Sequence, residues 1–201
     1  YSYANFVPVK EEIFGRLPVT IALAVGAAVL WTLVGIPIGI ISAVKRGSVW
    51  DRGSMVFALI GVSAPVFWLA YLFLYVFWFK LGWAPPSGIP IGESVLQAVL
   101  SGRFILPWIV LSMTFAAFYA RMVRGNLIET MGEDYIRTAR AKGLSEKRVI
   151  YKHGLRAALT PVVTMFGLDL AVLLGGAFIT ETVFGLPGVG QYAVRSIFLN
   201  G

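Results

Sequence analysis

Long apolar stretches alternate with short polar ones along this chain of 201 residues. A helix needs about 20 apolar residues to cross a bilayer. Four stretches approach or exceed that length, at about 17–44, 55–79, 104–123 and 159–180. Their continuous apolar character favours helices over the alternating strands of an outer-membrane barrel. The pattern predicts an all-α, polytopic membrane helix bundle that forms a single transmembrane domain over 1–201.

The composition agrees with a membrane setting and excludes several kinds of chemistry. Mean hydropathy is +0.79, and charged residues make up 13% of the chain, against about a quarter in soluble domains. The chain has no cysteine and one histidine, so we expect no disulfide and no metal site. No GxxxxGK[ST] phosphate loop occurs. We expect no catalytic residue and no bound cofactor in this chain.

The basic residues predict the orientation. Most of the 17 lie in two loops, at 45–52 and about 121–158, and the positive-inside rule places both loops in the cytoplasm. Both ends of the chain then lie outside, together with the segment 181–201. Since no signal peptide is visible, we expect a further membrane helix before residue 1. The basic loops are short, tethered and without a nucleic-acid-binding motif, so we expect no nucleic-acid partner.

The charged insert at 121–158 has helix signals of its own. Residues 133–142 are good helix formers with acids at the start and bases at the end. Gly143 predicts the end of this helix, and Ser145 is a candidate N-cap of a second one. The small residues Thr138, Ala139 and Ala141 suit insertion into a partner's groove. A solvated loop that only sets topology explains the insert equally well.

A resemblance decides between these interpretations. The segment DYIRTARAKGLSEKRVIYKHGLRAALTPVV, at 134–163, resembles the EAA loop of ABC importer permeases in the dipeptide, oligopeptide and nickel family. ETVFGLPGVGQ at 181–191 and several other stretches are also similar to that family, closest to its B-type (first) permease. The general EAA pattern has a glutamate and an alanine where this chain has Arg137 and Thr138, a departure typical of the peptide branch.

The resemblance implies a fold, a function and partners. It implies the type I ABC importer permease fold, in the multi-pass inner membrane of a prokaryote. The chain would form half of the translocation path for di- or oligopeptides, or for nickel or another small solute. We expect a second homologous permease subunit, two ATP-binding subunits that bind ATP and Mg²⁺, and an extracytoplasmic substrate-binding protein as partners.

The resemblance also assigns a coupling role to the first helix of the insert, which would contact an ATPase subunit. The residues are Asp134, Tyr135, Ile136, Arg137, Thr138, Ala139, Arg140, Ala141, Lys142, Gly143 and Leu144. We expect Arg140→Glu or Ala139→Trp to weaken ATPase docking.

Polar residues inside the apolar segments are candidates for the translocation path. Asp169 is the strongest, because an isolated acid within a membrane is costly; a structural hydrogen bond explains it equally well. Ser63, Thr114 and Thr164 are weaker candidates. Near the outer gate the candidates are Glu181, Phe184, Pro187 and Gly188.

Two functions of other classes compete with an importer. A channel or ion-gradient-driven transporter could use Asp169 as its ion site, but such a protein needs more ionisable residues in the membrane. A passive anchor leaves Asp169 unexplained.

Overall fold

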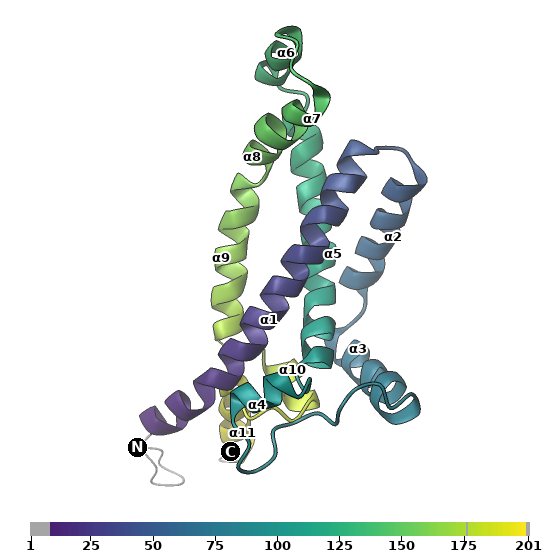
Figure 1. Cartoon of the computed structure of the whole chain (residues 1–201). Helices are drawn as coiled ribbons and strands as arrows, with labels where there is room; N and C mark the ends of the chain where they lie inside the picture. Colours follow the sequence, from purple (N-terminus) through teal and green to yellow (C-terminus); the bar gives the residue numbers. More distant parts are fainter. Residues whose placement is uncertain (1–8, 176, 200–201) are drawn as a thin grey trace. The chain divides into compact units, whose positions relative to one another are not determined.

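The computed structural model describes residues 9–175 and 177–199, which fold into helices without any strand (Figure 1). The helices in chain order are α1 (Val9–Val44), α2 (Val49–Ser63), α3 (Val66–Phe73), α4 (Val95–Leu100), α5 (Ile105–Thr130), α6 (Asp134–Ala141), α7 (Glu146–Arg148), α8 (Leu155–Ala158), α9 (Thr160–Leu174), α10 (Phe178–Val183) and α11 (Val189–Leu199). Two π-helical segments, Leu74–Lys80 and Val149–Gly154, follow α3 and α7. The predicted all-α class is confirmed.

Two helices, α1 and α5, are each long and apolar enough to cross a membrane. Two broken pairs pass the same test when each pair is counted as one span: α2 with α3 and its π-helical extension, and Glu146–Ala158 with α9. The described residues therefore hold two spans, or up to four. Compared with the predicted segments, α1 begins earlier and α5 continues further, to Thr130, because polar helix ends can project beyond the hydrocarbon.

Prolines act differently according to their place in a helix. Pro65 has an extended backbone (ψ 134°) and is the N-cap of α3, so it separates α2 from α3. Pro107 and Pro161 lie in the first turns of α5 and α9, where a missing backbone N–H costs nothing. Pro37 is inside the uninterrupted α1.

The chain divides into two compact units. One comprises 1–30, 64–112 and 169–201, and the other comprises 31–63 and 113–168. We call them the first unit and the second unit. The residue ranges of α1, α5 and α9 contribute to both.

Aromatic side chains fill the interior of the second unit. Trp31 of α1 is fully buried. Its ring stacks on Phe115 with centroids 4.6 Å apart and contacts Tyr119 and Phe166 at 5.9 and 5.8 Å. Such ring pairs add about 0.5–1.5 kcal/mol to the burial of their area. They join α1, α5 and α9 within this unit.

Glycines let two helices approach α5 closely in the same unit. A Cβ at Gly35 would lie 2.8 Å from the carbonyl oxygen of Ala116, and one at Gly39 would lie 2.7 Å from that of Ala120. A Cβ at Gly61 of α2 would lie 2.6 Å from the Cβ of Ala117. The GxxxG pair of α1 therefore packs against α5 of its own chain.

The first unit joins α1 to the start of α5 and to the C-terminal helices. The indole N–H of Trp108 donates a hydrogen bond of 2.9 Å to the carbonyl oxygen of Ala22. Gly26 lies against the same indole ring, where no Cβ would fit. α10 packs against both α3 and α11.

Candidate functional site

The charged insert folds into a helix, a glycine turn and a second short helix, as the sequence predicts. α6 begins after Glu133, whose backbone is extended (ψ 151°), and carries Asp134 in its first turn and Arg140 in its last. These charges suit the helix dipole. Ser145 occupies the predicted N-cap position of α7, although its side chain makes no capping hydrogen bond.

The glycine turn after α6 is a Schellman motif. The amide of Gly143 donates to the carbonyl oxygen of Arg140 at 2.9 Å, and the amide of Leu144 donates to that of Ala139 at 3.4 Å. Gly143 has φ +78°, a conformation that costs glycine little and other residues more. The turn therefore has a defined geometry that holds α6 and α7 at a fixed angle.

A small apolar cluster packs against the inner side of α6 within the insert. Ile136, Ala139 and Val149 are buried, and Met131 and Leu144 pack against them. Leu144 supplies the hydrophobic contact that accompanies a Schellman motif. Ala139 is only 7% exposed, so it faces this cluster and does not lie on the outer surface of α6. A tryptophan at position 139 would overpack the cluster.

Arg140 has a partner within the insert. Its guanidinium donates to both carboxylate oxygens of Glu146, from Nη2 at 2.7 Å and from Nε at 3.1 Å. These hydrogen bonds lower the pKa of Glu146 and raise the pKa of Arg140. Both side chains are exposed, so water screens the pair. It spans the turn and links the end of α6 to the start of α7.

The outer surface of α6 is exposed. Tyr135 is 45% exposed, and Thr138 and Ala141 are also exposed. Arg137 lies beside them in an exposed ion pair of 3.2 Å with Asp134. This surface combines an aromatic ring, small side chains and one charge pair.

A buried polar network, which the sequence did not reveal, lies at the α1–α2 loop of the second unit. The carboxylate of Asp51 accepts two hydrogen bonds from Arg124 of α5, from Nε at 2.6 Å and from Nη2 at 3.0 Å. It also accepts from the hydroxyl of Ser42 at 2.6 Å and the amide of Gly47 at 2.8 Å. Asp51 is 5% exposed. The only available signal was that Asp51 is the single acid in a basic loop.

The four path candidates belong to different units. Asp169 is half-buried in the first unit, and the other three belong to the second. Ser63 is the exposed last residue of α2. The hydroxyl of Thr164 donates to the carbonyl oxygen of Thr160 in its own helix at 3.4 Å. The hydroxyl of Thr114 is buried and has no hydrogen-bond partner among the described residues. Their part in a path remains a prediction.

Three of the four outer-gate candidates are buried in the first unit. Glu181 is fully buried, Phe184 is nearly so, Gly188 is buried, and Pro187 is half-buried. A Cβ at Gly188 would overlap the carboxyl group of Glu181. These residues form a tightly packed turn between α10 and α11.

The Glu181 carboxylate connects this turn to α1. The hydroxyl of Thr20 donates to Oε1 at 2.8 Å and accepts from the amide of Val189 at 2.9 Å. The amide of Gln191, in the first turn of α11, donates to Oε2 at 2.8 Å. Glu181 thus satisfies an otherwise free amide at a helix N-terminus, where a negative charge is favourable.

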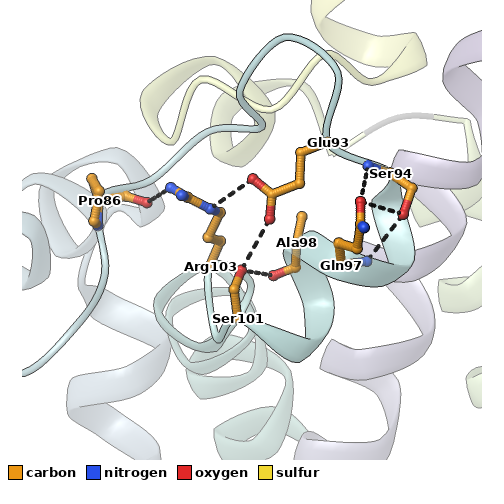
Figure 2. A network of polar contacts seen from close by, with 7 residues as sticks. All are labelled: Pro86, Glu93, Ser94, Gln97, Ala98, Ser101 and Arg103. Atoms are coloured by element: carbon orange, nitrogen blue, oxygen red, sulfur yellow. Dashed lines mark hydrogen bonds and ion pairs between the residues drawn. The ribbon is translucent and has the colours of Figure 1, made fainter.

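The loop between α3 and α5 has its own polar network around Arg103 (Figure 2). The guanidinium donates from Nη1 to the carbonyl oxygen of Pro86 at 2.9 Å, and Nε lies 3.2 Å from Oε2 of Glu93, without hydrogen-bond geometry. Ser101 donates to Oε1 of Glu93 at 3.3 Å. A capping box starts α4 beside this network. The network joins Pro86 and Glu93, inside the loop, to Ser101 and Arg103 just before α5.

The family model of the binding-protein-dependent transport system inner membrane component matches residues 35–200. The chain belongs to this family. It is a family of transport permeases that are integral to the inner membrane.

The sequence relatives of this chain include several peptide permeases. The chain is 42% identical to the dipeptide transport system permease protein DppB of Alkalihalophilus pseudofirmus, over 94% of this chain and 63% of the relative. It is 40% identical to the di/tripeptide permease DppB of Pseudomonas aeruginosa, over 94% and 62%. It is 39% identical to DppB of Escherichia coli, over 98% and 64%. The chain spans just under two thirds of these relatives. The predicted resemblance to B-type peptide permeases is confirmed.

Two solved structures show the same fold. The MetNI methionine ABC transporter, in inward facing conformations, matches with a TM-score of 0.70 and 22% identity over 96% of this chain and 83% of its own. An amino acid ABC transporter crystallised with histidines matches with a TM-score of 0.67 and 15% identity, over 99% and 85%. The predicted type I importer permease fold is therefore confirmed.

Proposed function

We propose that this chain is the membrane-spanning part of a permease subunit in an ATP-driven importer of di- or oligopeptides. Its relatives are named as permeases of dipeptide, di/tripeptide and peptide transport systems. A second homologous permease completes the translocation path, and an extracytoplasmic binding protein delivers the peptide. Two ATPase subunits bind ATP and Mg²⁺ on the cytoplasmic side. The complex lies in the inner membrane of a prokaryote.

The proposal depends most on the construction of α6. The helix is closed by a Schellman motif, supported by its own apolar cluster and braced to α7 by Arg140 and Glu146. A short helix held in this way transmits a displacement as a rigid body. Its outer surface, at Thr138 and Ala141, is free to dock into an ATPase cleft.

The connection of α6 to the membrane helices supports the same role. α5 is continuous from Ile105 to Thr130. A turn closed by the amides of Met131 and Gly132, bonded to the carbonyl oxygens of Leu127 and Glu129 at 3.0 and 2.9 Å, leads directly into α6. A push on α6 therefore reaches α5 through one short hydrogen-bonded turn. This is the mechanical requirement for coupling ATP hydrolysis to a bundle that alternates between two states.

Ala141→Trp tests the docking surface. Position 141 is exposed, so the added ring should leave the insert folded and still block a close protein contact. We expect ATPase recovery with the permease, and peptide uptake into proteoliposomes, to fall by about tenfold or more, as when a central interface contact is lost. Lys147→Trp on α7 places the same ring outside α6 and serves as the control. Normal complex assembly and uptake with Ala141→Trp would reject the coupling role.

The cargo is tested separately in the same proteoliposomes. With its binding protein present, the complex should accumulate a dipeptide only when ATP is enclosed with the ATPase subunits. Accumulation of Ni²⁺ in place of the dipeptide would identify the complex as a nickel importer of the same family. Uptake that survives ATP depletion and stops when the proton gradient is collapsed would identify an ion-driven transporter instead.

A further inference from the structure

An open pocket of about 390 Å³ lies on the insert in the second unit, beside the start of α9. Its lining residues are Tyr135, Lys152, His153, Arg156, Ala157 and Thr160. Two of these residues are cationic, and the imidazole of His153 and the hydroxyl group of Tyr135 can donate further hydrogen bonds. None of the six is acidic. The lining is suited to an anion that offers several acceptor oxygens.

The cationic groups of the pocket are not engaged elsewhere. Among residues 9–175 and 177–199, no ion pair involves Lys152 or Arg156. Arg137 and Arg140, on the same insert, each have a carboxylate partner. The positive charge of the pocket is therefore available to a ligand.

We propose that this pocket binds the phosphate-bearing headgroup of an anionic phospholipid. Arginine and lysine together recognise phosphate oxygens, the first through a planar fork of donors and the second as a point charge. The hydroxyl group of Tyr135 can donate to a remaining oxygen, whereas that of Thr160 already donates to the carbonyl oxygen of Arg156 at 3.4 Å.

The position of the pocket indicates a lipid as the source of the phosphate. Thr160 is the first residue of α9, the helix that begins the predicted fourth apolar segment. Val163 and Leu168 follow on α9 with 68% and 57% of their surfaces exposed. A headgroup in the pocket would therefore have apolar surface beside it for its acyl chains. Basic pockets at the cytoplasmic ends of membrane helices recognise anionic lipids by this combination.

The test measures lipid binding to the full-length permease complex, delipidated in detergent, by native mass spectrometry. Phosphatidylglycerol and phosphatidylcholine with the same acyl chains are added separately, and the wild-type complex should retain phosphatidylglycerol preferentially. Lys152→Gln combined with Arg156→Gln should weaken its binding by about 25-fold, since each basic residue near an anionic headgroup contributes about fivefold. Lys152→Arg combined with Arg156→Lys keeps both charges and should retain most of the binding.

A matched control separates the pocket from general positive charge. Lys147→Gln combined with Arg148→Gln removes the same charge from the same insert, at exposed positions that do not line the pocket. Equal losses in the two double glutamine variants would overturn the proposal. So would equal retention of the two lipids by the wild-type complex.

Two further outcomes would replace the lipid with another occupant. Displacement of phosphatidylglycerol by excess inorganic phosphate would assign the pocket to a soluble phosphate compound. Protection of Lys152 from amine-reactive labelling by the ATPase subunits, in lipid-free detergent, would assign the surface to a protein partner. Either result would overturn the lipid assignment, and neither depends on which cargo the complex transports.

Discussion

Two arginine–carboxylate pairs of the second unit have nearly the same geometry and very different surroundings. Arg124 and Asp51 are joined by two hydrogen bonds at 2.6 and 3.0 Å, and Arg140 and Glu146 by two at 2.7 and 3.1 Å. The Asp51 side chain is 8% exposed and that of Glu146 is 56% exposed. The first pair joins the α1–α2 loop to α5, and the second bridges a turn within the insert.

Because of this difference in burial, we expect the two pairs to stabilise the protein to very different degrees. A buried carboxylate without its partner retains a desolvated charge, so removing one side of the pair is costly. An exposed pair exchanges its contacts for water, and its loss changes stability little. We therefore expect Asp51 and Arg124 to stabilise the fold. Arg140 and Glu146 should chiefly affect the stiffness of the insert.

Loss of the buried carboxylate should have the largest effect. Asp51→Ala leaves Arg124, Ser42 and the amide of Gly47 without their acceptor, and should lower the free energy of unfolding by about 3 kcal/mol. Thermal unfolding of the purified permease, followed by tryptophan fluorescence, measures this effect. Glu129→Ala removes an exposed acid of α5 and is the control. Equal shifts for the two variants would contradict the role of the buried pair.

The apolar cluster beneath α6 should be next in importance. Ile136→Ala removes a fully buried side chain and should lower the local stability of the insert by about 2 kcal/mol. Hydrogen exchange at the amides of α6 should then accelerate, while α5 stays protected. Thr138→Ala changes an exposed neighbour and should leave exchange nearly unchanged. If Thr138→Ala accelerated exchange as much as Ile136→Ala, the cluster would not be what holds α6.

Replacing both members of the buried pair should recover much of the lost stability. Asp51→Leu combined with Arg124→Met leaves no unpaired buried charge, so we expect a cost of about 1 kcal/mol, less than that of Asp51→Ala. The residual cost reflects the donors of Ser42 and Gly47, which still lack an acceptor. Unfolding of the double variant is measured beside the single one. A double variant less stable than Asp51→Ala would show that the hydrogen bonds of this network contribute more to stability than the removal of an unpaired buried charge.

The exposed pair should have the smallest effect on stability and a measurable one on transport. Arg140→Glu should shift the melting temperature by less than about 1 °C, yet reduce ATP-driven uptake because α6 is no longer braced to α7. The charge-swapped variant, Arg140→Glu with Glu146→Arg, should restore uptake. Failure of the swap, with normal folding, would indicate that Arg140 contacts the ATPase directly.

The same pair gives a pH dependence with a definite sign. Pairing lowers the pKa of Glu146 from its usual value. The contribution of the pair is therefore fully present above the pKa of the unfolded state and is lost as pH falls through the lower pKa of the folded state. After correction for the intrinsic pH dependence of amide exchange, protection of the Gly143 amide, which donates to the carbonyl oxygen of Arg140, should fall in acid in the wild type and not in Glu146→Gln.

Local signals made the insert predictable. Acids and bases in the order that suits a helix dipole, a glycine for the positive φ at 143, and a capping residue at 145 all act within one or two turns of chain. The structure has its helices and its glycine turn where these signals indicate. Hydropathy likewise indicated long apolar segments, and α1 and α5 are helices long and apolar enough to cross a membrane.

The directions in which individual side chains of α6 point were harder to predict from the sequence. We expected Ala139 on the docking surface, and it packs inside the insert. We expected Arg140 to contribute to ATPase docking, and its guanidinium pairs with Glu146 of the same insert. On a helix of eight residues, composition alone does not determine which side faces the protein, since the neighbours of α6 come from beyond the turn.

By itself the sequence determined the helical class, the apolar segments, the helix–glycine–helix insert and the family. Only the tertiary structure decided that Asp51 meets Arg124, 73 positions away, that Glu181 meets Thr20, 161 positions away, and that four residues around Lys152 and Arg156 complete a pocket. The physical reason is the separation along the chain over which each interaction acts. Hydropathy, capping and backbone conformation are properties of neighbours in the chain, whereas a buried polar group takes whichever partner the packing of distant helices brings within 3 Å.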